Sequence, residues 1–177
     1  ATISSTVFPF GPSTPSIIAG SGGFARSPTL NRSNPPDGSM SGETSAGGRS
    51  RIAAEVRRVR PDIVVIELGA NDGLRGLPLA QLGANLGWMI GTAQAAGARV
   101  LLVGLQLPPN FGRYATDFQR SYVLISQRLG TGLVPHFLAP LGTERRWFQA
   151  DNLHPVAAAQ PLLAEQVLKA LDALPPR

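Results

Sequence analysis

Two short apolar runs, separated by a long amphipathic segment, constrain the fold more than any other feature of this sequence. The runs are residues 63–68 (IVVIEL) and residues 99–105 (RVLLVGL). Continuous runs of this length are typical of strands that are buried on both faces of a sheet. The segment between them has apolar residues at helical spacing, with Pro78 near its start and Gly97 at its end. The order strand, helix, strand predicts two parallel strands joined by a helical crossover.

The same alternation continues along the chain. Helical spacing predicts a helix over residues 51–60, which Pro61 ends, and a second one that Gly130 closes. A short third strand is predicted over residues 133–135, and a C-terminal helix follows Pro161. We therefore expect the α/β fold class, with a mainly parallel central sheet and ligands bound beyond the carboxyl ends of its strands.

Residues 1–50 differ in composition from the rest of the chain. They hold 8 Gly, 6 Pro and 11 Ser, a mixture typical of loops or disorder. Thr44 or Ser45 is expected to cap the helix that follows. The whole chain of 177 residues has the length of one domain, so we expect residues 1–177 to form a single unit.

The composition excludes several kinds of site. The chain has no Cys, which rules out disulfides, thiolate metal sites and cysteine nucleophiles, and its 2 His have no further ligands at matching spacing. We expect neither a metal nor an organic cofactor. The net charge of +5 includes a cluster of five arginines, namely Arg49, Arg51, Arg57, Arg58 and Arg60. We interpret this cluster as a solvated helix face and not as a nucleic-acid surface, because no aromatic residues interleave for base stacking.

Two polar motifs follow predicted strands or precede a predicted helix. The segment of residues 69–73 (GANDG) is suited to a tight turn, but the amide of Asn71 is also suited to stabilise an oxyanion. Near the C-terminus, Asp151 precedes His154 by three residues, a spacing at which a carboxylate reaches the imidazole Nδ1. The alternative is that Asp151 is a helix cap beside a surface histidine.

Four segments in a fixed order resemble one known family. They are SGETS (residues 41–45), ELGANDGLRG (67–76), LPPNFG (107–112) and DNLHP (151–155). Together they resemble the SGNH (GDSL) hydrolase superfamily and, within it, the bacterial thioesterase I, lysophospholipase and arylesterase branch. The resemblance covers about residues 39–174. It implies a three-layer α/β/α sandwich of the flavodoxin-like kind.

The resemblance also implies roles for single residues. His154 matches the general base and Asp151 the carboxylate that orients it. Gly42 matches a glycine whose backbone N–H stabilises the oxyanion, and Asn71 matches the asparagine whose side chain does the same. No metal or cofactor takes part in this chemistry.

The nucleophile of the family lies in a Gly-Asp-Ser motif, which this sequence lacks. Its nearest match is Gly-Pro-Ser at residues 11–13, so we expect Ser13 to be the nucleophile and the third oxyanion donor, with Ser16 in reserve. Because Pro12 replaces the aspartate, a non-catalytic homologue is one alternative. A carbohydrate O-acetyl esterase of the same superfamily is another.

The expected reaction is hydrolysis of carboxylic esters or thioesters of acyl chains, such as aryl esters, acyl-CoA and lysophospholipids. The expected partner is thus a small acyl ester, with transient contact with lipid and none with nucleic acid. Apolar loops above the sheet are expected to bind the substrate, through Asp72, Gly73, Leu74, Arg75, Leu107, Pro108 and Phe111.

No run approaches the roughly 20 apolar residues of a membrane helix. No leader opens the sequence, so we expect a processed periplasmic or secreted protein.

Overall fold

The computed structural model describes residues 4–5, 23–24 and 43–174 of the chain. The predicted alternation of helices and strands is confirmed in the segment from residue 43 onwards. Its longer elements, in chain order, are α1 (Ser45–Val59), β3 (Ile63–Ile66), α2 (Ala70–Leu74), α3 (Leu79–Ala95), β4 (Arg99–Val103), α4 (Gly112–Leu129), β5 (Gly132–Val134) and α5 (Gln160–Asp172). Short 3₁₀ helices lie at η1 (Pro109–Phe111), η2 (Ala139–Leu141), η3 (Arg145–Trp147) and η4 (Ala157–Ala159).

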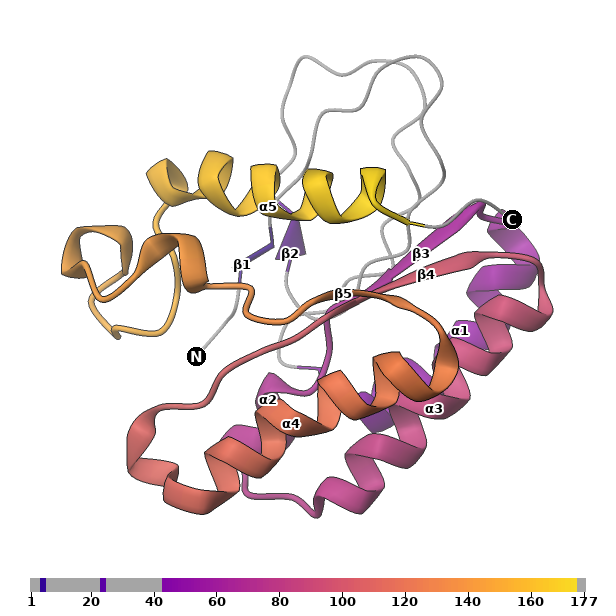
Figure 1. Cartoon of the computed structure of the whole chain (residues 1–177), viewed down its shortest axis with the longest axis horizontal. Helices are drawn as coiled ribbons and strands as arrows, with labels where there is room; N and C mark the ends of the chain where they lie inside the picture. Colours follow the sequence, from indigo (N-terminus) through magenta and orange to yellow (C-terminus); the bar gives the residue numbers. More distant parts are fainter. Residues whose placement is uncertain (1–3, 6–22, 25–42, 175–177) are drawn as a thin grey trace.

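The described strands from residue 43 onwards form a parallel sheet in the order β3-β4-β5. Helices α1, α3 and α4 cover one face of this sheet and α5 covers the other (Figure 1). Alternate residues of each strand serve the two faces, so Val64 packs with the first group of helices and Val65 with α5. This arrangement confirms the three-layer α/β/α sandwich. A separate pair of two-residue strands, β1 (Ser4–Ser5) and β2 (Gly23–Phe24), is also parallel.

Element boundaries differ from the predicted ones for local reasons. Helix α1 begins before residue 51, because the side chain of Thr44 caps it by accepting from the Gly47 N–H at 3.5 Å. It ends at Arg60, which adopts a left-handed conformation (φ 50°) directly before Pro61. The strand predicted over residues 63–68 pairs only over Ile63–Ile66, and the one predicted over residues 99–105 ends at Val103. That residues 1–177 form a single domain stays a prediction.

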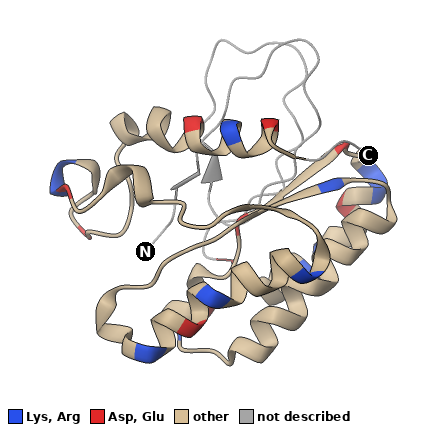
Figure 2. Cartoon of the chain, viewed as in Figure 1, with Lys and Arg blue, Asp and Glu red and all other residues tan. Residues whose placement is uncertain are grey.

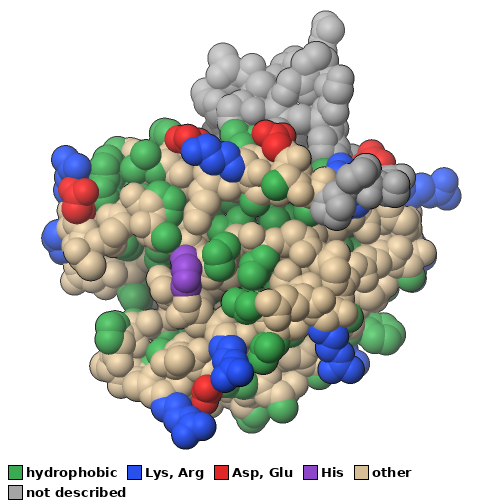
Figure 3. Space-filling view, in the orientation of Figure 1, with side chains coloured by type: hydrophobic (Ala, Val, Ile, Leu, Met, Phe, Trp, Pro, Cys, Tyr) green, Lys and Arg blue, Asp and Glu red, His purple; other side chains and the backbone are tan. Residues whose placement is uncertain are grey.

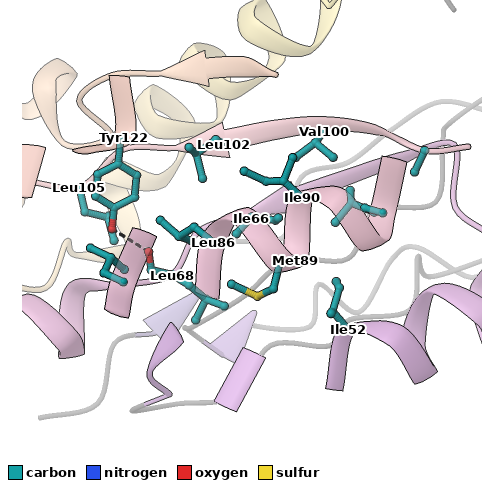
Figure 4. Close-up of a cluster of buried hydrophobic side chains, with 14 of the residues drawn as sticks. Ile52, Ile66, Leu68, Leu86, Met89, Ile90, Val100, Leu102, Leu105 and Tyr122 are labelled. Atoms are coloured by element: carbon teal, nitrogen blue, oxygen red, sulfur yellow. Dashed lines mark hydrogen bonds between the residues drawn. The ribbon is translucent and has the colours of Figure 1, made fainter. Parts of the chain in front are cut away.

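The larger core cluster lies between the sheet and helices α1, α3 and α4 (Figure 4). At its edge the hydroxyl of Tyr122 donates to the carbonyl oxygen of Leu68 at 2.7 Å. Gly69 follows with φ 117°, and a Cβ there would lie 2.2 Å from the Tyr122 hydroxyl. Only glycine fits this turn, which redirects the chain from β3 into α2.

Most charged residues lie on the helices and loops around the sheet, and Arg99 lies at the start of β4 (Figure 2). Along α5, for example, Glu165, Lys169 and Asp172 alternate in sign, and Lys169 pairs with Glu165 at 2.7 Å. In the arginine cluster of α1, Arg51 pairs with Glu43 and Arg58 pairs with Glu55. These two arginines therefore form contacts within the chain, and the absence of a nucleic-acid partner stays a prediction.

Large apolar side chains are well exposed at four described positions, which are Leu74, Trp88, Leu124 and Leu153. Figure 3 shows one face of the molecule, where hydrophobic side chains lie beside the one visible histidine. None of the helices in the described part of the chain is long and apolar enough to cross a membrane.

Candidate active site

The Asp151–His154 motif forms a tight turn between η3 and η4. One carboxylate oxygen of Asp151, Oδ1, accepts from the backbone N–H groups of Leu153 and His154, each at 3.0 Å. The other, Oδ2, forms a short hydrogen bond with the imidazole Nδ1 of His154. Asn152 adopts a left-handed conformation (φ 58°), which asparagine tolerates. The structure thus brings the two predicted residues together.

These hydrogen bonds fix the electrostatics of the pair. The bond from the His154 side chain, helped by the two backbone N–H groups, holds the pKa of Asp151 well below its usual range. An ionised carboxylate at Nδ1 keeps a proton on that nitrogen and leaves the lone pair on Nε2. In this tautomer Nε2 is the nitrogen that can accept a proton.

The imidazole of His154 is buried. The residue is 3% exposed, and its Nε2 has no hydrogen-bond partner among the residues that the structure describes. A buried polar atom of this kind usually has a partner. Ser13 and Ser16, the predicted nucleophile and its reserve, lie outside the described residues, and so does Gly42.

The turn that carries the pair is held at its base. Phe148 and Pro155 form an antiparallel bridge, and the Gln149 N–H donates to the carbonyl oxygen of His154 at 2.7 Å. The Arg145 guanidinium donates through Nη1 to the carbonyl oxygens of Phe148 and Gln149, at 2.9 and 2.7 Å. These contacts close the loop on both sides of Asp151.

Asn71 lies in the first turn of α2, beyond the carboxyl end of β3. Its Nδ2 donates to the carbonyl oxygen of Glu43 at 2.9 Å, which uses one of the two amide hydrogens. The bond fixes the orientation of the amide, and the second N–H has no partner among the residues that the structure describes. Glu43 directly follows Gly42 in the sequence. Asn71, one predicted oxyanion donor, is thus bonded to the residue that directly follows Gly42, the other predicted donor.

The structure assigns other tasks to three residues predicted to bind substrate. Asp72 is 2% exposed, and its carboxylate accepts from both the N–H and the hydroxyl of Ser45. A Cβ on Gly73 would lie 2.7 Å from the Leu107 side chain and 2.8 Å from that of Phe118. Gly73 and Leu107 therefore pack against each other in the core. The side chain of Asp72 anchors α1 through Ser45, and a contact of these three residues with substrate stays a prediction.

The other predicted substrate-binding residues lie nearer the surface. Leu74 and Arg75, at the end of α2, are exposed, whereas Pro108 and Phe111 are half-buried. Phe111 packs against the larger core cluster and lies 6.4 Å from the ring of Tyr114. The Tyr114 hydroxyl in turn donates to the carbonyl oxygen of Leu77 at 2.6 Å. Their contact with substrate stays a prediction.

Sequence reasoning missed several residues that shape the site. Asn85 is buried on the face of α3 that Leu82 and Leu86 also occupy, and a polar residue at a core position is a usable signal. The contact of Arg145 with the loop carbonyls had no signal in the sequence. Glu67 follows β3, and burial raises its pKa to about 8. Its place inside the apolar run of residues 63–68 is a signal of the same kind.

Comparison with known proteins identifies the family. A model of the GDSL-like lipase/acylhydrolase family matches residues 16–161. The chain belongs to this family. The match begins after Ser13 and includes Ser16, Asn71, Asp151 and His154.

Three curated relatives are ester hydrolases by name. The chain is 50% identical to the esterase TesA of Pseudomonas aeruginosa over 137 residues, which cover 77% of this chain and 68% of TesA. It is 40% identical to an arylesterase of Vibrio mimicus, over 76% of this chain and 68% of that one. It is 36% identical to the thioesterase 1/protease 1/lysophospholipase L1 of Escherichia coli K12, over 77% of this chain and 66% of that one.

Solved structures agree with this family. A crystal structure of TesA superposes with a TM-score of 0.75 at 49% identity, covering 78% of each chain. The psychrotrophic esterase EstA from Pseudoalteromonas sp., inhibited by monoethylphosphonate, gives a TM-score of 0.73 at 36% identity, covering 77% of this chain and 75% of that one. The protein is an ester hydrolase with the SGNH-hydrolase fold. The comparisons favour neither a carbohydrate deacetylase nor a non-catalytic homologue.

Proposed function

We propose that this enzyme hydrolyses carboxylic esters and thioesters of acyl chains through a triad of Ser13, His154 and Asp151. The substrate classes are aryl esters, acyl-CoA and lysophospholipids. The observation that carries the proposal is the hydrogen bond that Nδ1 of His154 donates to the carboxylate of Asp151, which leaves the buried Nε2 as a base. The names of the relatives support the choice of aryl esters, thioesters and lysophospholipids.

The reaction follows from these roles. The Ser13 hydroxyl oxygen attacks the acyl carbonyl carbon while Nε2 of His154 takes the hydroxyl proton. The oxyanion that forms is stabilised by the free N–H of Asn71 and by the backbone N–H groups of Gly42 and Ser13. His154 then returns the proton to the leaving alcohol or thiol. Water, deprotonated by the same nitrogen, releases the acyl group from the serine.

Exposed apolar side chains beside the proposed catalytic groups support an acyl substrate. Leu74 lies on α2 with Asn71 and is 37% exposed, and Leu153 directly precedes His154 and is 38% exposed. Apolar side chains at the mouth of a site suit an acyl chain or an aryl ring more than a sugar. Export of the protein to the periplasm or the medium stays a prediction, which cell fractionation would test.

Covalent labelling tests the proposed triad. The purified protein is treated with a fluorophosphonate, and the adduct is measured by intact mass and located by peptide mass spectrometry. We expect one adduct per chain at Ser13, which disappears in His154→Ala and persists in His136→Ala, the matched control at the other histidine. An adduct at Ser16 or another serine would assign the nucleophile to that residue and not to Ser13. A folded protein that forms no adduct contradicts the proposed triad.

A further inference from the structure

A buried chain of hydrogen bonds joins the first turn of α1 to helices α2 and α3. The N–H of Ser45 donates to Oδ2 of Asp72 at 2.8 Å, and its hydroxyl donates to Oδ1 at 2.5 Å. Asn85 donates through Nδ2 to the hydroxyl oxygen of Ser45 at 2.9 Å, and Arg49 donates to Oδ1 of Asn85 at 3.2 Å. Ser45, Asp72 and Asn85 are 0%, 2% and 4% exposed. We call these four residues the Ser45 network.

The hydrogen bonds of the Ser45 network run in one direction: Arg49 donates to Asn85, Asn85 donates to Ser45, and Ser45 donates to Asp72. A guanidinium has no acceptor, so Arg49 must bind the oxygen of the Asn85 amide and thereby orients it. The amide nitrogen of Asn85 then faces Ser45. Because the Ser45 oxygen accepts this bond, its own proton goes to Asp72. Each bond fixes the next, and removing one donor leaves a buried polar group without its partner.

We propose that the Ser45 network positions the oxyanion hole, an inference that rests on the proposed function of Asn71 and Gly42. Asn71 and Asp72 are consecutive residues of α2. Asn71 binds the carbonyl oxygen of Glu43, and Asp72 binds Ser45 two residues further along. The same two backbone segments are thus tied twice. A shift between them would move Asn71 relative to the backbone that continues from Gly42.

The chemistry of the reaction makes such a shift costly. Donors stabilise an oxyanion only where they meet the position that the oxygen takes in the transition state. A misplacement of about 1 Å costs on the order of a hundredfold in rate. Ground-state binding depends less on these donors, so the network is expected to act on kcat and to leave KM nearly unchanged. In this sense Ser45 and Asn85 are positioning residues.

The test compares two buried serines. Ser45→Ala removes the hydroxyl of the network, and Ser126→Ala removes a buried hydroxyl on α4 that donates to the carbonyl oxygen of Thr131 at 3.0 Å. Ser45→Ala loses two buried hydrogen bonds, one to Asp72 and one from Asn85, whereas Ser126→Ala loses one, and only the first variant touches the network. We expect kcat for an aryl ester to fall about tenfold in Ser45→Ala, with KM and the circular dichroism spectrum unchanged. Ser126→Ala should keep the kcat of the parent.

Asn85→Asp provides a second variant with nearly the same shape. Its carboxylate still accepts from Arg49 but donates nothing to Ser45, whereas its protonated form donates again. We therefore expect kcat of Asn85→Asp, divided by that of the parent at the same pH, to rise as the pH falls. A loss caused only by weaker folding would not follow the protonation of this one group. This variant also replaces Ser45→Ala if the latter does not fold.

The outcomes separate the inference from the proposed function. If Asn71→Ala loses kcat on the order of a hundredfold or more while folded Ser45→Ala and Asn85→Asp keep it, only the role of the network is overturned. The same holds if Ser126→Ala loses as much as Ser45→Ala. If Asn71→Ala itself keeps its kcat, Asn71 is no oxyanion donor and both statements fall.

Discussion

The carboxylate of Asp151 binds His154 twice, once at the imidazole Nδ1 and once at the backbone N–H. A single carboxylate thus shapes the turn and orients the ring that the turn carries. The two residues lie three positions apart, so the pair forms within one loop and needs no other element to bring it together. What the rest of the fold supplies is the burial of the ring.

Asp151→Asn tests the orientation of the ring. An amide in this position donates to Nδ1 and places the imidazole proton on Nε2, so His154 no longer acts as a base. We expect kcat to fall on the order of 10³- to 10⁴-fold, as for a wrong tautomer in a serine triad. Steady-state kinetics with an aryl ester measure this loss, and Asp117→Asn, at an aspartate that pairs with Arg113 on the surface of α4, is the control. A kcat within a few-fold of the parent contradicts the proposed role.

The lowered pKa of Asp151 predicts how its contribution to stability depends on pH. A carboxyl whose pKa is lower in the folded state stabilises the fold above its ordinary value of 3.8. This stabilisation is lost as the pH falls through the lowered value. We expect Asp151→Ala to have a lower Tm than the parent at pH 6 and a smaller difference below about pH 3.

Asp117→Ala is the control for that measurement, because Asp117 forms an exposed pair with Arg113 at 3.4 Å. Its Tm should stay close to that of the parent throughout. A difference for Asp151→Ala that does not shrink in acid shows that the loss does not come from the carboxylate.

Exposed leucines beside the site predict a preference for acyl chains. We expect Leu74→Ser and Leu153→Ser to raise KM for p-nitrophenyl esters of long acyl chains, by about threefold to tenfold, and to change KM for the acetate ester little. Leu124→Ser, at a leucine that is 52% exposed on α4, is the matched control and should leave both unchanged. Equal changes for long and short esters would contradict contact with the chain.

The contacts of Arg145 predict that its substitution lowers kcat through the loop that carries Asp151 and His154. Arg145→Met removes the donors to the carbonyl oxygens of Phe148 and Gln149 and keeps most of the apolar stem. Because these bonds are exposed, we expect a moderate loss, about twofold to fivefold in kcat. Arg146→Met is the control, since Arg146 pairs with Glu144 at 2.8 Å and lies over the Trp147 ring. An equal loss in both variants would show a general effect of charge.

The raised pKa of Glu67 predicts a contribution to stability that falls as the pH rises, opposite to that of Asp151. Burial raises the pKa of this carboxyl from 4.5 to about 8, so ionising it costs more in the folded than in the unfolded chain. Stability that the neutral form provides is therefore lost as the pH rises from about 5 to 8. The free energy of unfolding of Glu67→Gln, compared with that of the parent at the same pH, should rise by more than about 1 kcal/mol over this range. Urea unfolding at several pH values measures the gain, with Glu144→Gln as an exposed control.

Local patterns explain how much of the fold was predictable. From residue 51 onwards, the strands and the longer helices follow from runs and periods a few residues long, whereas α2 lies where a turn was expected. The order of these elements implied a mainly parallel sheet, and the family resemblance implied the three layers. Boundaries were less predictable. The sequence run continues to Leu68, but strand pairing ends at Ile66, and the local pattern does not reveal that end.

The candidate site divides in the same way. Asp151 and His154 meet through a spacing of three residues, and the sequence predicted this contact. Asp72 and Leu107 each follow a predicted strand, and both were expected to bind substrate. The structure uses Asp72 to hold Ser45, 27 positions away, and Leu107 to pack against Gly73. Spacing alone does not show such distant partners.

The sequence by itself determined the order of the elements, the family resemblance and the local turn that joins Asp151 to His154, because each depends on neighbours along the chain. Only the tertiary structure decided which polar groups are buried together. The bond between Asn85 and Ser45 spans 40 positions. It exists because α1 and α3 pack side by side on one face of the sheet, where a buried amide must find a partner.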